Sequence, residues 1–296
     1  MYINSFFDTS FSVFPLLSRY LNKLPKKPIV MAPRGEFTKG ALGLKKIKKI
    51  LFIIFSKLIK LHKELVWQAS SSFESDRIQH VTGADARRIF VVPDMPVSIK
   101  NNKDQIQSNH IDSAGTFKIC FLSRICPIKN LEFCLRVINE INVPVIFDIY
   151  GPKEDEVYWS KCERILNDLS STVTASYKGA IEHSQVMTVL SNYDLFFFPS
   201  CGENYGHVIL ESMLVGTPVL ISDATPWKNL KNIGVGWDLS LNNKKAFVNA
   251  IEEAAAKSLE EYEEWRKHVS SYADEISNDD DVMQANKKLF LNSVDS

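Results

Sequence analysis

From residue 116 onward, short apolar runs alternate with stretches of helical periodicity, and this alternation limits the folds that the chain can adopt. Alternating strands and helices are typical of βαβ units, in which the strands are parallel and helices cover the sheet. The second part of the chain is therefore predicted to be an α/β domain with a parallel, Rossmann-like sheet. The predicted strands are 117–123, 144–150, 173–178, 195–199 and 218–222, and the predicted helices are 131–141, 156–169, 184–191, 206–215, 244–256 and 259–272.

The first hundred residues contain fewer such units. Apolar runs predict strands at 27–32, 66–69 and 89–92, which are too few for an independent domain, so these residues are predicted to be part of a larger one. Residues 100–113 are polar and rich in turn-forming types, as in a linker, and the last predicted helix is 282–292. We divide the chain into a partial domain (1–98), a linker (99–115), a complete domain (116–276) and a C-terminal helical segment (277–296) that is expected to return toward the first domain.

The formal net charge of the 296-residue chain is zero, but its charges are unevenly distributed. Residues 1–97 carry sixteen Lys and Arg against seven Asp and Glu, and the remainder carries the opposite excess. A basic half beside an acidic half indicates that only the first half faces an anionic partner. Arg34 and the lysines supply this positive charge, and a membrane surface would be a sufficient anionic partner for them. No nucleic-acid partner is predicted.

Several absences in the sequence indicate a cytoplasmic protein. The five cysteines are odd in number and form no C-x-x-C pair, which is typical of reduced thiols rather than of a disulfide framework or a zinc site. No run of about eighteen apolar residues is present, and the N-terminus lacks the basic and apolar regions of a signal peptide.

The segment 44–63 is strongly basic and also apolar. It holds seven lysines and no acidic residue, and Ile47, Leu51, Ile54, Leu58 and Leu61 would share one face of a helix. A basic amphipathic helix is typical of an element that lies on a membrane surface, here the inner face, or that binds a partner. The alternative is a helix packed on the core with solvated lysines, and the sequence leaves both interpretations open.

Two glutamates eight positions apart, Glu203 and Glu211, lie where a buried strand passes into a helix. The apolar run 195–199 ends in a Pro/Ser/Gly break, and the helix is predicted to open at 204–206. Glu203 is therefore placed at the carboxyl end of a strand and Glu211 about one and a half turns into the helix. Ligands of open parallel sheets bind at that edge, and two carboxylates there suit the hydroxyl groups of a sugar.

Cations are predicted at the same edge. Arg124 and Lys129 follow the strand 117–123, and two converging cations can hold a diphosphate and neutralise it as a leaving group. The helix that opens after Asn204, Tyr205 and Gly206 offers backbone N–H groups to an anion. Two solvated loop charges are the alternative interpretation of Arg124 and Lys129.

The sequence does not favour a metal site at Glu203 and Glu211. His207 lies four positions from both Glu203 and Glu211, but Glu203 precedes the helix and no supporting ligand pattern is evident. The acidic run 279–281 contains a D-x-D pattern, yet it follows no strand and is interpreted as a helix cap. We therefore predict no metal site.

Taken together, these segments resemble the donor-nucleotide domain of the retaining GT-B glycosyltransferases of family 4, the glycosyl transferases group 1. The resemblance extends over roughly 117–240 and also includes the segments 3–8, 32–37 and 69–74, which are similar to the later part of that family's acceptor-side domain. The segments that match the family are FLSRICPIKN (121–130), YGP (150–152), YKGA (177–180), FPSCGENYGHVILESM (198–213), GTPV (216–219), TPW (225–227) and GWD (236–238).

The resemblance implies a role for each matching position. Glu203 would bind the transferred sugar, Glu211 would bind the ribose hydroxyls, and Arg124 with Lys129 would bind the diphosphate. Arg124, Lys129 and Glu203 would act in catalysis, and the other donor-binding residues would be Ser123, Lys178, Gly179, Ala180, Asn204, Tyr205 and Gly206. The expected substrates are a nucleotide-diphosphate sugar and a glycan or lipid-linked acceptor of cell-surface polysaccharide synthesis, with retention and with no metal or other cofactor.

The chain departs from the family pattern in two places. Ser123 occupies the position of the usual glycine before the arginine. The family's first strand, its glycine-rich loop and the histidine that helps seat the donor sugar have no counterpart in this sequence, so the acceptor-side domain is expected to be truncated. A catalytically inert module that binds nucleotide sugar, or a partner subunit, is therefore the alternative hypothesis.

Overall fold

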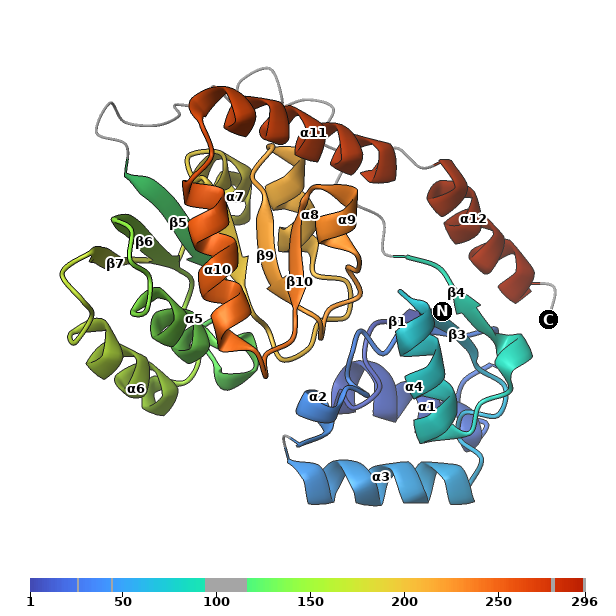
Figure 1. Cartoon of the computed structure of the whole chain (residues 1–296). Coiled ribbons are helices and arrows are strands. Elements are labelled where there is room, and N and C mark those ends of the chain that lie inside the picture. Colours follow the sequence, from blue (N-terminus) through green and yellow to red (C-terminus); the bar gives the residue numbers. More distant parts are fainter. Residues whose placement is uncertain (26, 44, 94–115, 278–279, 295–296) are drawn as a thin grey trace. The chain divides into compact units, whose positions relative to one another are not determined.

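The computed structural model describes residues 1–296 except for 26, 44, 94–115, 278–279 and 295–296. The chain divides into two compact units, one formed by Met1–Met95 with Asp279–Ser296 and the other by Pro96–Asn278. Each unit has its own parallel sheet (Figure 1). The predicted linker 99–115 lies outside the described residues. No helix of the described part of the chain has the length and apolar character needed to cross a membrane.

The unit Pro96–Asn278 is built around six parallel strands. They are β5 (Phe117–Leu122), β6 (Val145–Tyr150), β7 (Val173–Gly179), β8 (Leu195–Phe198), β9 (Val219–Ser222) and β10 (Gly236–Leu239). Their order in the sheet is β10-β9-β8-β5-β6-β7. The chain therefore starts in the middle of the sheet, moves outward to β7, and returns to the other side of β5 to continue outward to β10. The direction reverses between the paired neighbours β5 and β8.

Helices cover both faces of this sheet (Figure 1). The helix α5 contacts α6 and α10 on one face, and α8 contacts α7 and α11 on the other. Because both faces are covered, β8 and β9 are buried along their whole length and read as continuous apolar runs. The helices are α5 (Leu131–Ile138), α6 (Glu156–Leu166), α7 (Val186–Leu190), α8 (His207–Leu214), α9 (Leu230–Ile233), α10 (Lys244–Ala255) and α11 (Leu259–Ser277), with short 3-10 turns η4 (Pro127–Lys129) and η5 (His183–Gln185).

The unit that contains the N-terminus has a smaller sheet of four parallel strands in the order β1-β2-β3-β4. The strands are β1 (Tyr2–Ile3), β2 (Val30–Met31), β3 (Val66–Ala69) and β4 (Ile89–Val91). The helices are η1 (Thr9–Val13, a π-helix), α1 (Phe14–Tyr20), α2 (Lys39–Gly43), α3 (Lys46–Leu58), α4 (Ser72–Thr82), the 3-10 turn η2 (Ala86–Arg88) and α12 (Asp280–Val294).

Alternate side chains of this smaller sheet enter two separate apolar clusters. Trp67 and its neighbours pack with residues of α1, α3 and α4 on one face. Val66 on the opposite face packs with Leu289 of α12. The side-chain amide of Asn286 also donates to the Pro93 carbonyl oxygen at 3.2 Å. The C-terminal helix thus completes the core of the N-terminal sheet.

The predicted α/β architecture with parallel sheets is confirmed, and the predicted strands are present, most of them with shifted ends. Two strands were not predicted. β1 has only two residues, and β10 begins at Gly236 and contains Asp238, so neither carries an apolar run that marks a buried strand. Both form because a neighbouring strand supplies hydrogen-bond partners.

Gly151 directly follows β6, at a point where two loops approach closely. Its φ is +131°, and a Cβ atom built there would lie 1.8 Å from the Ser123 carbonyl oxygen. Substitution with alanine is therefore expected to destabilise the protein by about 2–4 kcal/mol, because backbone must move. Urea denaturation of Gly151→Ala measures this loss. Gly202→Ala is the control, since nothing lies within 4 Å of its Cβ position, and an equal loss in both variants would contradict the argument.

Candidate functional site

The loops that follow β5 and β8 meet at the carboxyl edge of the larger sheet. In open parallel sheets this reversal point is where ligands bind. The Cys201 N–H donates to the Ile128 carbonyl oxygen at 2.8 Å, and the Asn130 side-chain amide donates to the Pro199 carbonyl oxygen at 3.1 Å. The two loops are therefore tied together by backbone groups and not only by their side chains.

The loop after β5 is also tied to the loop after β6. The Ile125 N–H donates to the Pro152 carbonyl oxygen at 2.8 Å, and the Asp155 N–H donates to the Ile125 carbonyl oxygen at 3.3 Å. The Ser123 N–H donates to the Tyr150 carbonyl oxygen at 3.1 Å. The close approach at Gly151 belongs to the same junction. The loop after β5 is thus positioned on both sides, by β6 and by β8.

Lys129 and Glu203 form an ion pair at this junction. Lys129 Nζ lies 2.6 Å from Glu203 Oε1, and the side chains are only 14% and 10% exposed. Lys129 Nζ also lies 5.3 Å from the centre of the Phe198 ring, which ends β8. A pair with so little exposure is screened by water much less than a surface pair is. The sheet therefore presents a cation and a carboxylate as one fixed unit.

Arg124 lies in the same loop but has a different partner. Its guanidinium nitrogen Nη1 donates to both carboxylate oxygens of Glu154, at 2.8 and 2.6 Å. Both side chains are about half exposed. Exposed pairs of this kind contribute little to stability, so the guanidinium can exchange Glu154 for another anion at low cost.

The segment Asn204–Gly206 leads into α8. Gly206 is the N-cap with a φ of +79°, a backbone conformation that favours glycine, and it has no side chain to cap the helix. Trp227, from the loop after β9, donates its indole N–H to the Tyr205 carbonyl oxygen at 2.6 Å. Its ring also meets the Tyr205 ring edge-on at 5.6 Å. These contacts fix the entry into the helix.

Glu211 is buried one turn further along α8, with 9% of its surface exposed. Burial raises the pKa of its carboxyl group, and the neighbouring His183 and His207 partly oppose this shift. The His183 Nε2 atom lies 3.8 Å from Glu211 Oε1 and belongs to η5, which follows β7. The turn after β7 thus lies beside α8 at a carboxylate with little access to solvent.

The remaining predicted residues lie at the end of β7. Lys178 Nζ is 3.4 Å from Asp148 Oδ1 on β6, so this lysine points to a neighbouring strand. Gly179 has a φ of +88° with open space at its Cβ position, and the following Ala180 is exposed. The Gly151 N–H donates to the Gly179 carbonyl oxygen at 2.8 Å, which joins this end of β7 to the same edge.

The N-terminal unit has an ordered edge of its own. Glu36, after β2, accepts hydrogen bonds from the Ser5 hydroxyl and from the Phe6 N–H in the loop after β1. Glu74, at the start of α4, accepts from the Gly35 N–H at 2.6 Å and from the Ser70 N–H at 2.8 Å. The carboxylates of segments 32–37 and 69–74 therefore hold the loops at the carboxyl ends of β1, β2 and β3 together.

Within the described residues, no three His, Cys, Asp or Glu side chains lie close enough together to hold a metal ion. Glu203, His207 and Glu211 consequently do not form such a group. The side chains of the acidic run 279–281 lie outside those that the structure describes.

The chain also matches a protein-family model. The model described as "Glycosyl transferases group 1" matches residues 102–273, which is more than half of the chain. The chain belongs to this family. No curated protein sequence matches the chain at a significant level.

Solved structures of glycosyltransferases share the fold. HepE from Anabaena, in complex with UDP and glucose, superimposes with a TM-score of 0.69 at 14% identity, covering 95% of this chain and 74% of HepE. WaaG, a glycosyltransferase involved in lipopolysaccharide biosynthesis, gives 0.68 at 12% identity, covering 98% and 84%. Sucrose-phosphate synthase from Thermosynechococcus elongatus gives 0.71 at 15% identity, covering 98% and 72%. Identities this low show a common fold, and the two parallel-sheet units have the GT-B fold.

The structure of this glycosyltransferase-family chain brings some predicted residues together and gives others separate partners. Lys129 and Glu203 are in direct contact, and Asn204–Gly206 follow them into the helix of Glu211. Arg124 faces Glu154 and Lys178 faces Asp148, two carboxylates for which the sequence predicted no role. The sequence did not predict the contacts made by Glu154, His183 and Trp227. Of these three residues, only Trp227 belongs to a segment that resembles the family.

Removing one member of the Lys129–Glu203 pair is expected to be costly. Lys129→Met leaves a poorly exposed carboxylate without its cation and should lower the free energy of unfolding by about 1–3 kcal/mol. Adding Glu203→Gln should restore part of this loss. The control is Lys231→Met, which breaks the exposed Lys231–Glu253 pair and should cost less than about 0.5 kcal/mol. Equal losses in chemical denaturation would show that the first pair is not special.

Proposed function

We propose that this chain is a retaining glycosyltransferase that moves a hexose from a nucleotide-diphosphate sugar to a glycan or lipid-linked acceptor in cell-surface polysaccharide synthesis. The observation that carries the proposal is the Lys129–Glu203 pair at the reversal point of the six-stranded sheet. A cation beside a carboxylate at this edge matches a ligand that has both a phosphate and sugar hydroxyls.

Each predicted donor residue has a chemical role in this proposal. The Lys129 ammonium has three donors, so it can bind a phosphate oxygen while it keeps Glu203 oriented toward the sugar hydroxyls. Arg124 leaves its exposed partner Glu154 and binds the diphosphate. The backbone at Asn204–Gly206 and the start of α8 face the same anion, and Glu211 accepts hydrogen bonds from the ribose hydroxyls.

Ser123, Lys178, Gly179 and Ala180 complete the donor site in this proposal. Gly179 and Ala180, with little or no side chain at the end of β7, leave room for the base. Lys178 is about half exposed, so its contact with Asp148 does not prevent it from meeting the donor. Ser123 contributes to the loop after β5 that surrounds the phosphates.

Retention follows if the acceptor hydroxyl attacks the face of the sugar from which the diphosphate leaves. The bond from the anomeric carbon to the phosphate oxygen breaks, a bond to the acceptor oxygen forms, and the acceptor proton passes to the departing phosphate. Arg124, Lys129 and the start of α8 stabilise the charge that develops on the diphosphate. Because these groups supply the stabilisation, the proposal includes no metal and no other cofactor.

The solved structures support the substrate class. HepE is described in complexes with UDP, with UDP and glucose, and with UDP-glucose. A TarM variant from S. aureus is described with UDP, fondaparinux and α-GlcNAc-glycerol. WaaG is described as involved in lipopolysaccharide biosynthesis, and WaaB as a lipopolysaccharide outer core galactosyltransferase. By analogy with these proteins, we assign to this chain a nucleotide-sugar donor and a cell-surface acceptor.

A lipid-linked acceptor is available only at a membrane. We therefore place the enzyme in the cytoplasm, with peripheral attachment to the inner face of a membrane through the basic segment 44–63. The excess of positive charge in residues 1–97 supports this orientation.

Donor binding is tested at Glu211. Glu211→Gln should weaken the binding of a nucleotide-diphosphate sugar by roughly 10–100-fold, because a carboxylate accepts stronger hydrogen bonds than an amide oxygen. Calorimetry with UDP, GDP and ADP sugars measures this change and also identifies the base. Glu253→Gln, on an exposed surface pair, is the control and should bind normally. Unchanged affinity in Glu211→Gln would remove the proposed role of Glu211.

The pH dependence of Glu211 separates binding from stability. Burial raises the pKa of Glu211, so donor affinity should fall as the pH is lowered through this raised value and the carboxylate is protonated. Because its pKa is raised, the folded state favours the protonated form of Glu211. The ionised carboxylate therefore lowers the free energy of unfolding at neutral pH, and this loss is recovered as the pH falls. Glu211→Gln should therefore have an equal or higher Tm at neutral pH, by about 0–3 °C, and should lose this pH dependence.

Turnover distinguishes the enzyme from the inert alternative. Pure protein is incubated with donor and a lipid-linked acceptor, and NMR of the product reports the configuration at the anomeric carbon. A product with retained configuration, and a loss of rate in Lys129→Met of roughly 100-fold or more, are expected. Donor binding without any turnover would instead support an inert nucleotide-sugar-binding module or a partner subunit.

A further inference from the structure

The helix α3 exposes an apolar stripe on its outer face. Ile47, Leu51, Ile54 and Leu58 recur at helical spacing and are 76%, 61%, 50% and 77% exposed. Ile50 and Phe55 flank this stripe and are also exposed. The stripe, defined by these six residues, extends over the length of the helix.

The stripe is separate from the face that anchors α3 to its own unit. Phe52 and Ile53 pack on the core cluster around Trp67, and Ser56 is fully buried. At about 100° per residue these positions lie opposite the stripe. A surface helix normally presents polar residues to water on the side that faces away from the core. Here both sides are apolar, so the outer side is built to contact something other than water.

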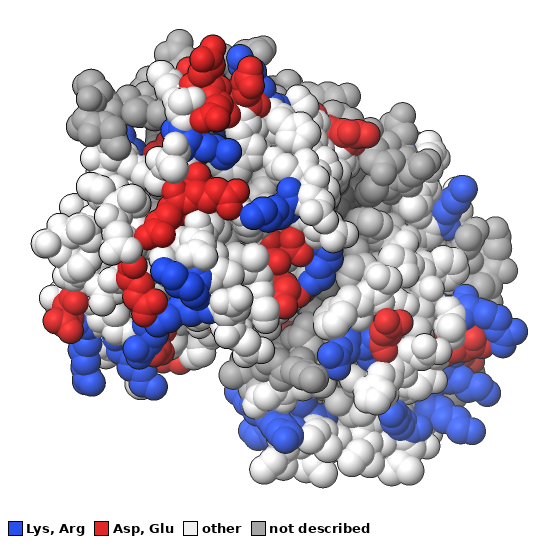
Figure 2. Space-filling model, in the orientation of Figure 1, with Lys and Arg blue, Asp and Glu red and all other residues white. Residues whose placement is uncertain are grey.

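Lysines border the stripe on both sides. Helical spacing places Lys48 along one border and Lys46 with Lys57 along the other, and all three are exposed. No Asp or Glu occurs between residues 39 and 63. In the space-filling view the charged atoms at the lower edge of the molecule, where α3 runs, are those of Lys and Arg (Figure 2). The helix thus has an apolar centre and cationic margins.

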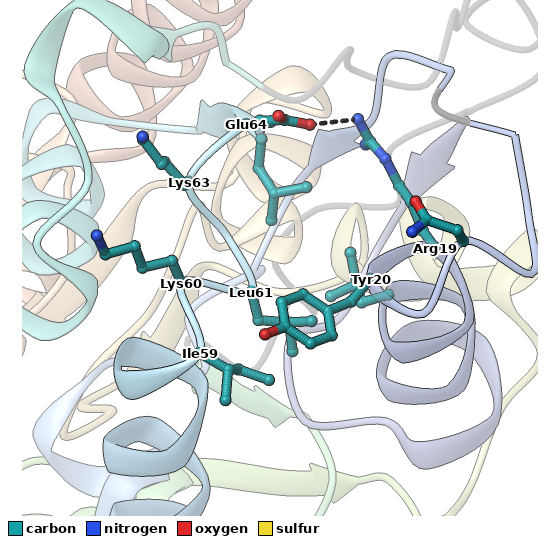
Figure 3. A pocket seen from close by; sticks show the side chains of 10 residues that line it. Arg19, Tyr20, Ile59, Lys60, Leu61, Lys63 and Glu64 are labelled. Atoms are coloured by element: carbon teal, nitrogen blue, oxygen red, sulfur yellow. Dashed lines mark hydrogen bonds and ion pairs between the residues drawn. The ribbon is translucent and has the colours of Figure 1, made fainter.

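A cavity of about 260 Å³ opens at the C-terminal end of α3, between that end and the C-terminal end of α1. Tyr20, Ile59 and Leu61 form its apolar part, and Lys60 and Lys63 extend to one side of it (Figure 3). Arg19 and Glu64 form an ion pair across the rim, with Nη2 and Oε2 3.0 Å apart. Because Arg19 and Glu64 are paired with each other, Lys60 and Lys63 carry the excess positive charge beside the cavity, next to the exposed Leu58.

Charge decides between the surfaces that such a stripe could contact. The cores of protein–protein interfaces are depleted in lysine, and two copies of α3 packed together would bring their lysine margins into mutual repulsion. A bilayer with anionic headgroups satisfies both features, because it offers an acyl layer to the stripe and phosphates to the lysines.

We propose that α3 lies flat in the interface of an anionic phospholipid bilayer, with the stripe among the acyl chains. Lys46, Lys48 and Lys57 contact headgroup phosphates along the helix, and the cavity beside Lys60 and Lys63 receives one headgroup at its end. This gives residues and a lipid class to the peripheral attachment proposed for segment 44–63. It rests on the N-terminal unit alone and holds whether or not the donor site binds a nucleotide sugar.

The test is flotation of the full-length protein with two kinds of vesicle, phosphatidylcholine alone and phosphatidylcholine with about one quarter phosphatidylglycerol. The protein should float with the anionic vesicles, and less so at about 0.5 M salt, where headgroup attraction is screened. Leu51→Ser with Leu58→Ser should weaken binding more than tenfold. Each substitution of a lysine by Gln should weaken vesicle binding roughly fivefold. This applies to Lys46, Lys48 and Lys57 along the helix and to Lys60 and Lys63 beside the cavity.

Matched controls lie in the same unit. Phe73→Ser removes an exposed apolar residue of α4, and Lys287→Gln with Lys288→Gln removes two exposed lysines of α12. Both controls should float like the original protein. All variants should keep their Tm and their affinity for nucleotide, since each changed side chain is exposed or at the rim of the cavity and belongs to the N-terminal unit, whereas the donor site belongs to the other unit.

Three results would overturn the proposal. One is that the full-length protein stays unbound with anionic vesicles. Another is that the Leu51→Ser, Leu58→Ser variant floats as well as the controls. The third is that light scattering shows an oligomer which this variant dissolves, because the stripe would then be a protein contact. A loss of nucleotide binding without a loss of flotation would contradict the donor site and leave the lipid surface intact.

Discussion

The pairing of β5 with β8 is the interaction on which the larger unit depends. These strands are far apart in the chain, yet they are neighbours in the sheet, and the order of the strands reverses between them. Parallel pairing aligns their carboxyl ends, so the two following loops have to meet. Backbone hydrogen bonds then hold the loops in register, and Lys129 and Glu203 come within 2.6 Å as a consequence.

Each cation predicted to meet the donor already faces a carboxylate, and the three contacts differ in exposure. Arg124 with Glu154 is about half exposed, Lys178 with Asp148 is less so, and Lys129 with Glu203 is nearly enclosed. The cost of separating such a pair rises as water is excluded. In the proposed mechanism Lys129 and Glu203 therefore act as a fixed unit, and Arg124 is the group that moves to the diphosphate.

The N-terminal unit shows a different use of apolar surface. One face of its sheet is buried under α1, α3 and α4, and the other is buried under α12. Parallel sheets are usually covered on both faces in this way. The helix α3 then carries a second apolar face that this packing leaves exposed. Periodicity alone does not show which face of segment 44–63 meets the core, so the sequence is compatible with both a membrane-surface helix and a core-packed helix. The structure shows both features in one helix, with Phe52 and Ile53 inside and the stripe outside.

The sequence by itself determined the α/β class and most strands of both sheets. This was possible because a strand that is buried on both faces has a continuous apolar sequence, such as Leu195–Phe198. It also indicated Glu203 and Lys129 as residues of one edge, since both follow such runs. Only the tertiary structure decided that these two touch, that Glu154 holds Arg124, and that His183 lies beside Glu211. Side-chain partners from different loops depend on strand order and loop geometry, and no local pattern in the chain records those.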